Sequence, residues 1–304
     1  FEFLFTKRTL LGPEDPRQLL PLLLKARQES ATAAYAADLL RQTGFEKLEI
    51  HPGYQLRVRT LGSFQLWRGR EAVGRKAWQR KKARQLFLFL LTNHSRMLHR
   101  QQIVETLWPD LSAQTGARDF KIAYNALISV LEPQRSRNAP SAYIERDGSR
   151  YGLRQTADLW FDVAEFDRLI VKGDRRLARQ PEEARTLYQQ ALAHYQGEYL
   201  QAFPYETWAM QERTRLLNRY LRTAERLARS HLHEGAWGEA IDVCQALLDH
   251  DNCWEPAYQI LIQAYGKMGN RSQALRTYQR CEETLRDELG LAPAEATRKL
   301  IAPR

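Results

Sequence analysis

A seven-residue pattern recurs after 34 residues in the second half of the chain. Gly235 to Ile241 reads GAWGEAI, and Gly269 to Leu275 reads GNRSQAL. Each copy places Gly before a helical run, Ala where two helices can cross closely, and an aliphatic residue directly after it. A period of 34 residues is typical of stacked helix pairs, in which each pair buries its apolar face against the next. The repeat therefore predicts a helical array in this half of the chain.

Amphipathic segments on both sides of the repeat extend this prediction. Almost every segment ends at Gly or begins beside Pro, which is the usual punctuation of helices. The expected helices are Val163 to Gly173, Pro181 to Gly197, Tyr205 to Gly235, Trp237 to Asp251, Glu255 to Gly269 and Arg271 to Gly290. We therefore expect residues 156–304 to form a tetratricopeptide-like helical domain.

Positive charge is concentrated before this helical part. Residues 51–155 contain 19 Lys and Arg against 7 Asp and Glu, a net charge of +12. Residues 1–50 contain 7 of each kind, and residues 156–304 contain 20 against 22. The formal net charge of +10 is thus local. Because Lys and Arg that neutralise phosphates release condensed counterions, a basic segment between neutral ones favours binding to nucleic acid.

The hydrophobic pattern of this basic segment begins as strands. Leu56 to Trp67 alternates with period two, and the turn at Arg68 to Arg70 returns the chain, which predicts a small antiparallel sheet. From Trp78 onward, apolar residues recur at helical spacing instead. A second helix is expected over Arg100 to Leu107, because Trp108-Pro109 forbids its continuation.

A third helix and a hairpin complete this segment. Ser112 or Thr115 can cap a helix that runs to Leu131. Asp147-Gly148 between aromatic and β-branched runs is a strong hairpin signal over residues 143–153. The order of small sheet, three helices and hairpin predicts a winged helix-turn-helix over residues 51–155. The expected fold class is mainly α: this winged helix, followed by the helical repeats.

One face of the third helix has the residue types that recognise bases. Its apolar stripe, expected to face a core, consists of Phe120, Ala123, Tyr124, Leu127 and Leu131. Arg pairs well with guanine, Asn with adenine, and an aliphatic side chain with the methyl group of thymine. The expected base-reading residues lie on the opposite face: Arg118, Lys121, Ile122, Asn125 and Ser129.

Cations also crowd the first turn of the first helix, where they oppose the helix macrodipole. An external anion such as phosphate would compensate for them, and the hairpin tip carries further cations. The expected contacts to phosphate, or contacts made by the wing, are Arg80, Lys81, Lys82, Arg84, Arg100, Arg146, Ser149 and Arg150.

These segments resemble a known family. The runs WQRKKARQLFLFLLTNHSRMLHRQQIVETLWPD, ARDFKIAYNALISVLEP and AYIERDGSRYGL resemble the OmpR-type winged helix of SARP-type transcriptional regulators. DLWFDVAEFDRLI, RTLYQQALAHYQGEYL and ALRTYQRCEETLRDELGLAPA resemble the bacterial transcriptional activator domain that follows it in that family. The resemblance implies that helix 113–131 enters the major groove and that hairpin 143–153 contacts the minor groove or the backbone. Many members have LRR where Ile128 to Leu131 stand, so their late arginine contacts are not carried over.

The resemblance implies a sequence-specific activator that binds double-stranded promoter DNA as a dimer or side-by-side pair. Its helical domain is expected to contact RNA polymerase. An adaptor that docks its basic module on an acidic protein surface is the alternative. RNA is a third option, which is disfavoured because the major groove of A-form RNA is too narrow for a recognition helix.

Two helices are expected before the basic segment, over Pro16 to Gln28 and Ala31 to Thr43. They resemble the tail of larger regulators in which a MalT-like ATPase and repeat region precedes the same pair of domains. Because the chain opens at Phe1 without Met, we expect it to be part of a longer protein.

Motifs for catalysis are absent from the sequence. It contains no phosphate-binding loop, no GxSxG, no HExxH and no glycine-rich dinucleotide loop. His231 and His233 are the only neighbouring histidines, and at this spacing on a helix they point to different faces. Three cysteines without CxxC spacing suit a reducing compartment, and no apolar run is long enough to span a membrane. We expect a cytoplasmic protein that is not an enzyme and has no cofactor or metal.

Overall fold

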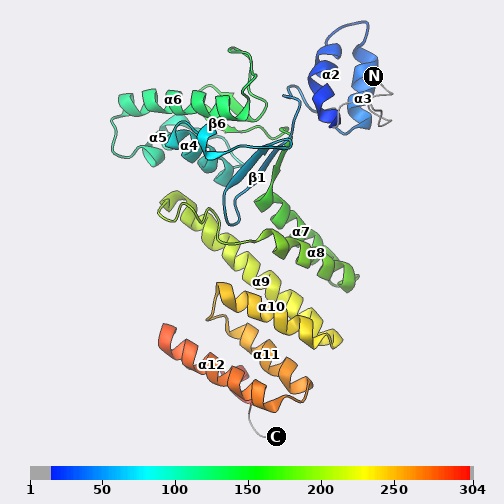
Figure 1. Cartoon of the computed structure of the whole chain (residues 1–304), viewed down its shortest axis with the longest axis vertical. Coiled ribbons are helices and arrows are strands. Elements are labelled where there is room, and N and C mark those ends of the chain that lie inside the picture. The colour runs from blue at the N-terminus through cyan, green and yellow to red at the C-terminus, as the bar shows by residue number, and fades with distance from the viewer. Residues whose placement is uncertain (1–14, 302–304) are drawn as a thin grey trace. The chain divides into compact units, whose positions relative to one another are not determined.

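The computed structural model describes residues 15–301 (Figure 1). Its contacts divide the chain into two compact units. The first contains the described residues up to Arg59, residues 64–161 and residues 205–209. The second contains residues 60–63, residues 162–204 and the described residues from Met210 onward. Each unit therefore includes one short segment that lies, in sequence, between two parts of the other unit. The predicted division into three domains remains a prediction.

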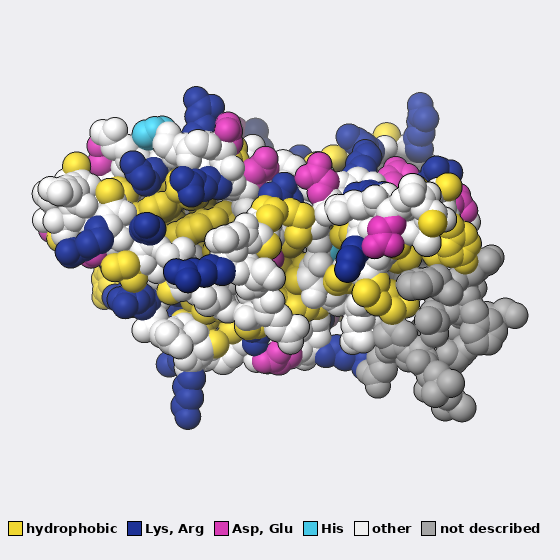
Figure 2. Space-filling view, turned by 90° about the horizontal axis from the view of Figure 1, so that it is seen from above, with side chains coloured by type: hydrophobic (Ala, Val, Ile, Leu, Met, Phe, Trp, Pro, Cys, Tyr) yellow, Lys and Arg dark blue, Asp and Glu magenta, His cyan; other side chains and the backbone are white. Residues whose placement is uncertain are grey.

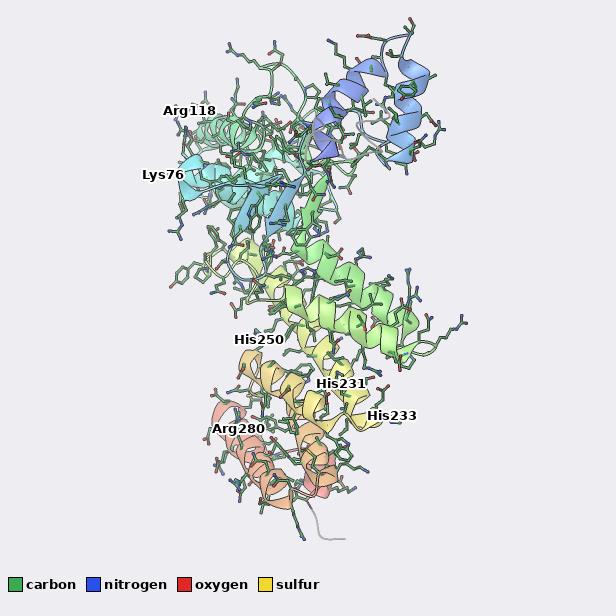
Figure 3. All side chains as sticks on the ribbon, turned by 45° about the vertical axis from the view of Figure 1, so that its right-hand side comes forward. Lys76, Arg118, His231, His233, His250 and Arg280 are labelled. Carbon is green, nitrogen blue, oxygen red and sulfur yellow. The ribbon has the colours of Figure 1, made fainter. Side chains whose placement is uncertain are left out.

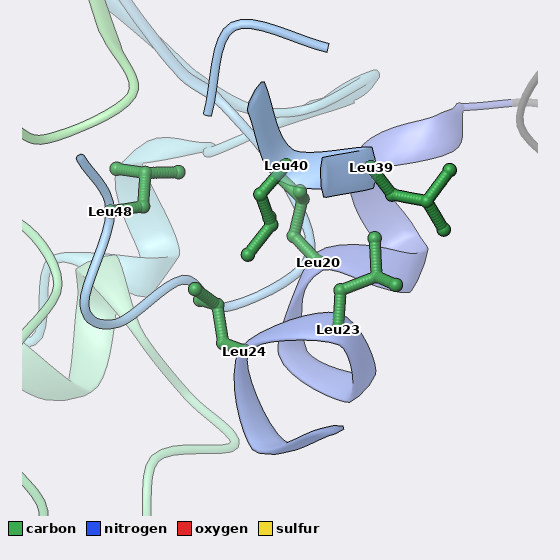
Figure 4. Close-up of a cluster of buried hydrophobic side chains, with 6 residues drawn as sticks. All are labelled: Leu20, Leu23, Leu24, Leu39, Leu40 and Leu48. Carbon is green, nitrogen blue, oxygen red and sulfur yellow. The ribbon is translucent and has the colours of Figure 1, made fainter. Parts of the chain in front are cut away.

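The first unit begins with a helical hairpin. A 3-10 turn, η1 (Pro16–Leu19), leads into α2 (Leu20–Ala26), and α3 (Ala33–Gln42) packs against α2. Both helices lie where the sequence predicts them. Their contact is a cluster of buried leucines, shown in Figure 4: Leu20, Leu23, Leu24, Leu39, Leu40 and Leu48.

A four-stranded sheet follows, with strand order β3-β2-β1-β7. The antiparallel strands β1 (Leu56–Arg59), β2 (Gln65–Arg68) and β3 (Glu71–Ala72) form the predicted small sheet. The fourth strand, β7 (Leu159–Phe161), pairs with β1 in parallel and was not expected from the sequence. Three residues are too few to show an alternating pattern, so this strand is defined by its partner.

Three helices and a second sheet complete the winged helix. Helix α4 (Lys81–Thr92) follows a 3-10 turn, η2 (Arg75–Ala77), and packs against α5 (Arg100–Leu107) and α6 (Ala113–Leu131). The second sheet has the order β4-β6-β5 and consists of β4 (Leu98–His99), β5 (Ile144–Asp147) and β6 (Arg150–Leu153). The predicted order of sheet, three helices and hairpin is therefore confirmed.

The second unit is a run of helices, and each of the longer ones packs against the next along the chain (Figure 1). They are α7 (Asp162–Arg176), α8 (Pro181–His194), α9 (Met210–Glu234), α10 (Trp237–His250), α11 (Glu255–Lys267) and α12 (Arg271–Leu289), with a short α13 (Glu295–Lys299) that the sequence did not predict.

The helix expected from Tyr205 begins five residues later, at Met210. The segment before it contains a 3-10 turn, η3 (Thr207–Ala209), and belongs to the first unit. There the Trp208 ring packs edge-on against Phe89 of α4, with 5.4 Å between the ring centroids. This packing explains why the segment does not continue as part of α9.

The 34-residue repeat is confirmed by the structure. Helices α10 and α12 begin 34 residues apart, and each follows a left-handed glycine, Gly235 at φ 81° and Gly269 at φ 74°. Ala240 and Ala274 are both buried at the helix crossings. The aliphatic residues after them differ, because Ile241 is 8% exposed whereas Leu275 is 44% exposed.

Candidate nucleic-acid interface

Helix α6 is amphipathic in the sense that the sequence predicts. It begins at Ser112, whose Oγ accepts a hydrogen bond from the Thr115 N–H at 3.3 Å. The predicted core stripe lies inside the unit, with Phe120, Ala123, Leu127 and Leu131 buried and Tyr124 half-buried. All five predicted base-reading residues are exposed: Arg118, Lys121, Ile122, Asn125 and Ser129.

The exposed face of α6 combines charged, polar and apolar side chains. The Arg118 side chain is 73% exposed and lies on the outer side of α6 (Figure 3). Ile122 is 38% exposed although it is aliphatic. The Ser129 hydroxyl donates to the Asn125 main-chain carbonyl at 3.0 Å, and the Asn125 residue is exposed. Such a face offers donors, acceptors and an apolar contact to base edges.

Helix α6 is held in place by aromatic contacts and one close helix crossing. Tyr151 of the wing packs edge-on against Phe120 and Tyr124, with centroid separations of 4.8 and 5.3 Å. At the crossing with α5, a Cβ added to Gly116 would lie 2.4 Å from Val104 Cγ1. Only glycine permits this approach of the two helices. The importance of Gly116 is not evident from the sequence, because an isolated glycine in a helix does not reveal which residue lies opposite.

The first turn of α4 lies beside α6. Arg80 and Lys81 are exposed there, and together with Trp108, Asp119 and Ile122 they surround a hollow of about 350 Å³. Figure 2, the view from above, shows Lys and Arg side chains around a band of hydrophobic ones. The arrangement brings phosphate-binding residue types next to the predicted base-reading face.

Lys82 and Arg84 differ from these exposed neighbours. The Lys82 ammonium donates a hydrogen bond to the Leu107 carbonyl at the end of α5 and lies 5.3 Å from the centroid of the Trp108 ring. Burial lowers the pKa of Lys82. Arg84 is half-buried, and burial followed by the nearby Arg75 lowers its pKa. The two predicted phosphate contacts are therefore less available to an external anion than Arg80 and Lys81.

The wing is tied to the start of α5. The Arg100 N–H donates to the Ser149 carbonyl at 2.8 Å, and His99 Nε2 lies 2.8 Å from Ser149 Oγ. His99 Nδ1 also accepts from the Gln101 N–H at 3.3 Å, so this ring caps α5. The side chains of Arg100, Arg146 and Arg150 remain exposed. The predicted wing residues and the amino-terminal end of α5 therefore lie together.

A buried glutamate that was not predicted from the sequence connects the end of α6 to the wing. Glu132 is 4% exposed, and its carboxylate accepts hydrogen bonds from the Ser141 hydroxyl and from the Ala142 N–H at 3.0 Å. The contact spans the loop between α6 and β5. Its only sequence signal is an acidic residue directly after a helix, which ordinarily indicates an exposed side chain.

The described residues contain no group of three or more His, Cys, Asp and Glu side chains placed to hold a metal ion. Cys244 and Cys281 are buried, and burial raises the pKa of each thiol to about 12. Across residues 15–301, no helix has the length and apolar character required to cross a bilayer.

Comparison with known protein families gives a match to the helical part of the chain. Residues 161–303 match the family model of the bacterial transcriptional activator domain. Together with the winged helix that precedes it, this match supports the sequence-based assignment to the SARP-type bacterial transcriptional regulators. No curated protein sequence matches the chain.

The fold is similar to that of a solved structure, described as Mycobacterium tuberculosis EmbR in complex with low affinity phosphopeptide. The TM-score is 0.68 at 21% identity, and the match covers 82% of this chain but 64% of that one. The Sgt2 TPR domain from Aspergillus fumigatus matches at 19% identity over 45% of this chain and 74% of that one. Its TM-score of 0.33 is too low to support a common fold.

Proposed function

We propose that the chain recognises specific sites in double-stranded promoter DNA and activates transcription. Helix α6 would enter the major groove, and the β5–β6 hairpin would act as the wing at the minor groove or the adjacent backbone. The observation that carries this proposal is the division of α6 into two faces. All five predicted base-reading side chains are exposed on one face, while the other face is packed into the unit.

Phosphate contacts would come from three places around α6. Arg80 and Lys81 lie at the first turn of α4, Arg100 at the start of α5, and Arg146 with Arg150 on the wing. Contacts to phosphate position the protein, whereas contacts to base edges discriminate between sequences. The second unit carries no comparable excess of positive charge, so its role would be contact with RNA polymerase or regulatory proteins.

Selection of bound sites from random duplexes, followed by titration of the selected duplex at two salt concentrations, tests this function. Affinity should fall steeply as salt increases, because each neutralised phosphate contributes roughly −0.9 to the slope of log K against log salt. Selection of a defined sequence would support base recognition by α6. Failure to enrich any sequence, or affinity that does not respond to salt, would instead favour an adaptor whose basic module binds an acidic protein.

A further inference from the structure

The outer face of the first sheet carries cations that the proposed DNA interface does not use. Arg57 of β1 is in register with Trp67 of β2 and with Trp160 of β7. Paired residues project from the same face of a sheet, and Arg59, two residues along β1, shares that face. We call these four residues, Arg57, Arg59, Trp67 and Trp160, the Trp–Arg row.

The opposite face of the sheet belongs to the core. Leu56 and Val58 are 0% exposed and Leu66 is 2% exposed, and these residues alternate with members of the row. Arg57 is exposed, and the rest of the row is half-buried. The row therefore lies on the outward side of the sheet, on elements other than α6 and the wing.

The two guanidinium groups are held against an indole. The central carbon of the Arg57 guanidinium lies 4.5 Å from the centroid of the Trp67 ring, and that of Arg59 lies 5.7 Å from it. Among the described residues, neither arginine has an ion-pair partner. A guanidinium stacked on an aromatic ring keeps its N–H edge available, and that edge fits a carboxylate with two parallel hydrogen bonds.

The rest of the face argues against a nucleic-acid backbone as the ligand. Gln65 is in register with Arg59, and Ala72 is in register with Trp67. Neither Gln65 nor Ala72 carries a charge. A surface that follows a phosphate backbone needs a longer run of cations. Two fixed guanidinium groups beside two indoles instead match protein interfaces, where Trp and Arg are the residue types most enriched among energetically dominant contacts.

We propose that the Trp–Arg row binds an acidic, partly apolar segment of a partner protein. Carboxylates of the segment would pair with Arg57 and Arg59, and its apolar side chains would pack on Trp67 and Trp160. This inference rests on the proposed function, since it gives a DNA-bound regulator a protein contact that leaves α6 and the wing free.

Fluorescence anisotropy of a short fluorescein-labelled peptide of alternating Glu and Leu, titrated with the full chain, tests the proposal. The variant with both Arg57→Glu and Arg59→Glu should bind the peptide at least about tenfold more weakly, because attraction becomes repulsion. Arg137→Glu, a single charge reversal, is the control for Arg57→Glu alone, since this exposed arginine lies in the loop between α6 and β5. It should leave peptide affinity unchanged.

The variants also separate this site from the DNA interface. The double variant should keep wild-type affinity for duplex DNA, and Arg57→Lys with Arg59→Lys should bind the peptide with intermediate affinity. Equal loss of peptide binding in the Arg137 control, or loss of duplex affinity as large as in Arg118→Ala, would overturn the proposal. So would displacement of the peptide by single-stranded DNA at the same charge concentration. If the wild-type chain binds the peptide but no duplex, the DNA function fails while this site stands.

Discussion

At the scale of single residues, the structure separates side chains that the sequence presents as equivalent. Arg80, Lys81 and Lys82 are consecutive cations, yet only Lys82 has its charged group directed into the unit. On α6, Asn125 and Ser129 share the exposed face, and the Ser129 hydroxyl is already bonded to a backbone carbonyl. Of these two side chains, Asn125 is therefore the better candidate for the proposed discrimination between bases.

Replacement of Asn125 by alanine should weaken binding to the selected duplex by about 1–3 kcal/mol and relax the preference at one base position. The reason is loss of a paired hydrogen bond to one base edge. Binding of the variant to a set of duplexes that differ at single positions measures this effect. An equal loss on selected and random duplexes would remove Asn125 from base recognition.

Replacement of Lys82 by methionine should lower stability and duplex affinity without changing the salt slope. Methionine keeps much of the contact with Trp108 but cannot donate a hydrogen bond to the Leu107 carbonyl. The turn between α5 and α6 therefore loses a stabilising hydrogen bond. Arg80→Gln is the control, and it should reduce the magnitude of the slope by about one contact. A similar change of slope in the Lys82 variant would identify it as a phosphate contact.

At the scale of elements, contacts between neighbouring segments determine how α6, the proposed recognition helix, is positioned. Helix α6 is positioned by its crossing with α5 at Gly116 and by the wing tyrosine Tyr151. The first sheet is positioned by polar contacts to Asp158, which lies directly before β7. The contacts of Gly116 and of Asp158 each support one prediction about stability.

Gly116→Ala should destabilise the first unit by about 1–3 kcal/mol, because the added methyl group would overlap with Val104. Urea unfolding measures the change in the free energy of unfolding. Adding Val104→Ala removes the opposing side chain, so the double variant should lose less than the sum of the two single variants. If the two losses in the free energy of unfolding simply add, contact with Val104 is not the reason why a larger residue at position 116 is destabilising.

Asp158→Asn should destabilise the first unit above the pKa of the carboxyl group but not below it. Asp158 Oδ2 accepts from Arg17 Nε at 2.6 Å and lies 3.4 Å from His51 Nε2, while Oδ1 accepts from Gln55 at 2.6 Å. Although burial acts in the opposite direction, the hydrogen bonds from His51, Gln55 and Arg17 lower the pKa of Asp158 below its ordinary value of 3.8.

Because the folded-state pKa is lowered, the stabilisation is present at neutral pH and is lost as pH falls through that pKa. Urea unfolding of wild type and variant at pH 7 and at successively lower pH gives the difference in stability. This difference should be about 1–3 kcal/mol at pH 7 and should shrink below pH 3.8. A difference that persists at low pH would assign the effect to packing instead of charge.

At the scale of the whole molecule, the chain joins a winged helix to a bacterial transcriptional activator domain, as the sequence predicts. Local periodicity was sufficient for the longer helices apart from the start of α9, for the hairpin, for the 34-residue repeat and for the exposed face of α6. Each of these features depends on residues close together in the chain, where spacing alone decides which side chains share a face. The upstream MalT-like region and the phosphate contacts remain predictions.

Other features were decided only by tertiary structure. Strand β7 pairs with β1, which lies about one hundred residues earlier, and Lys82 donates a hydrogen bond to a carbonyl at the end of α5. Val104 leaves no room for a side chain at Gly116. The Trp–Arg row likewise joins residues from three strands. Sequence periodicity shows which side of an element is buried, but it does not show which distant residue lies opposite. The division of positive charge between the proposed DNA-binding face, the internal contact of Lys82 and the outer face of a sheet therefore appears only once the chain is folded.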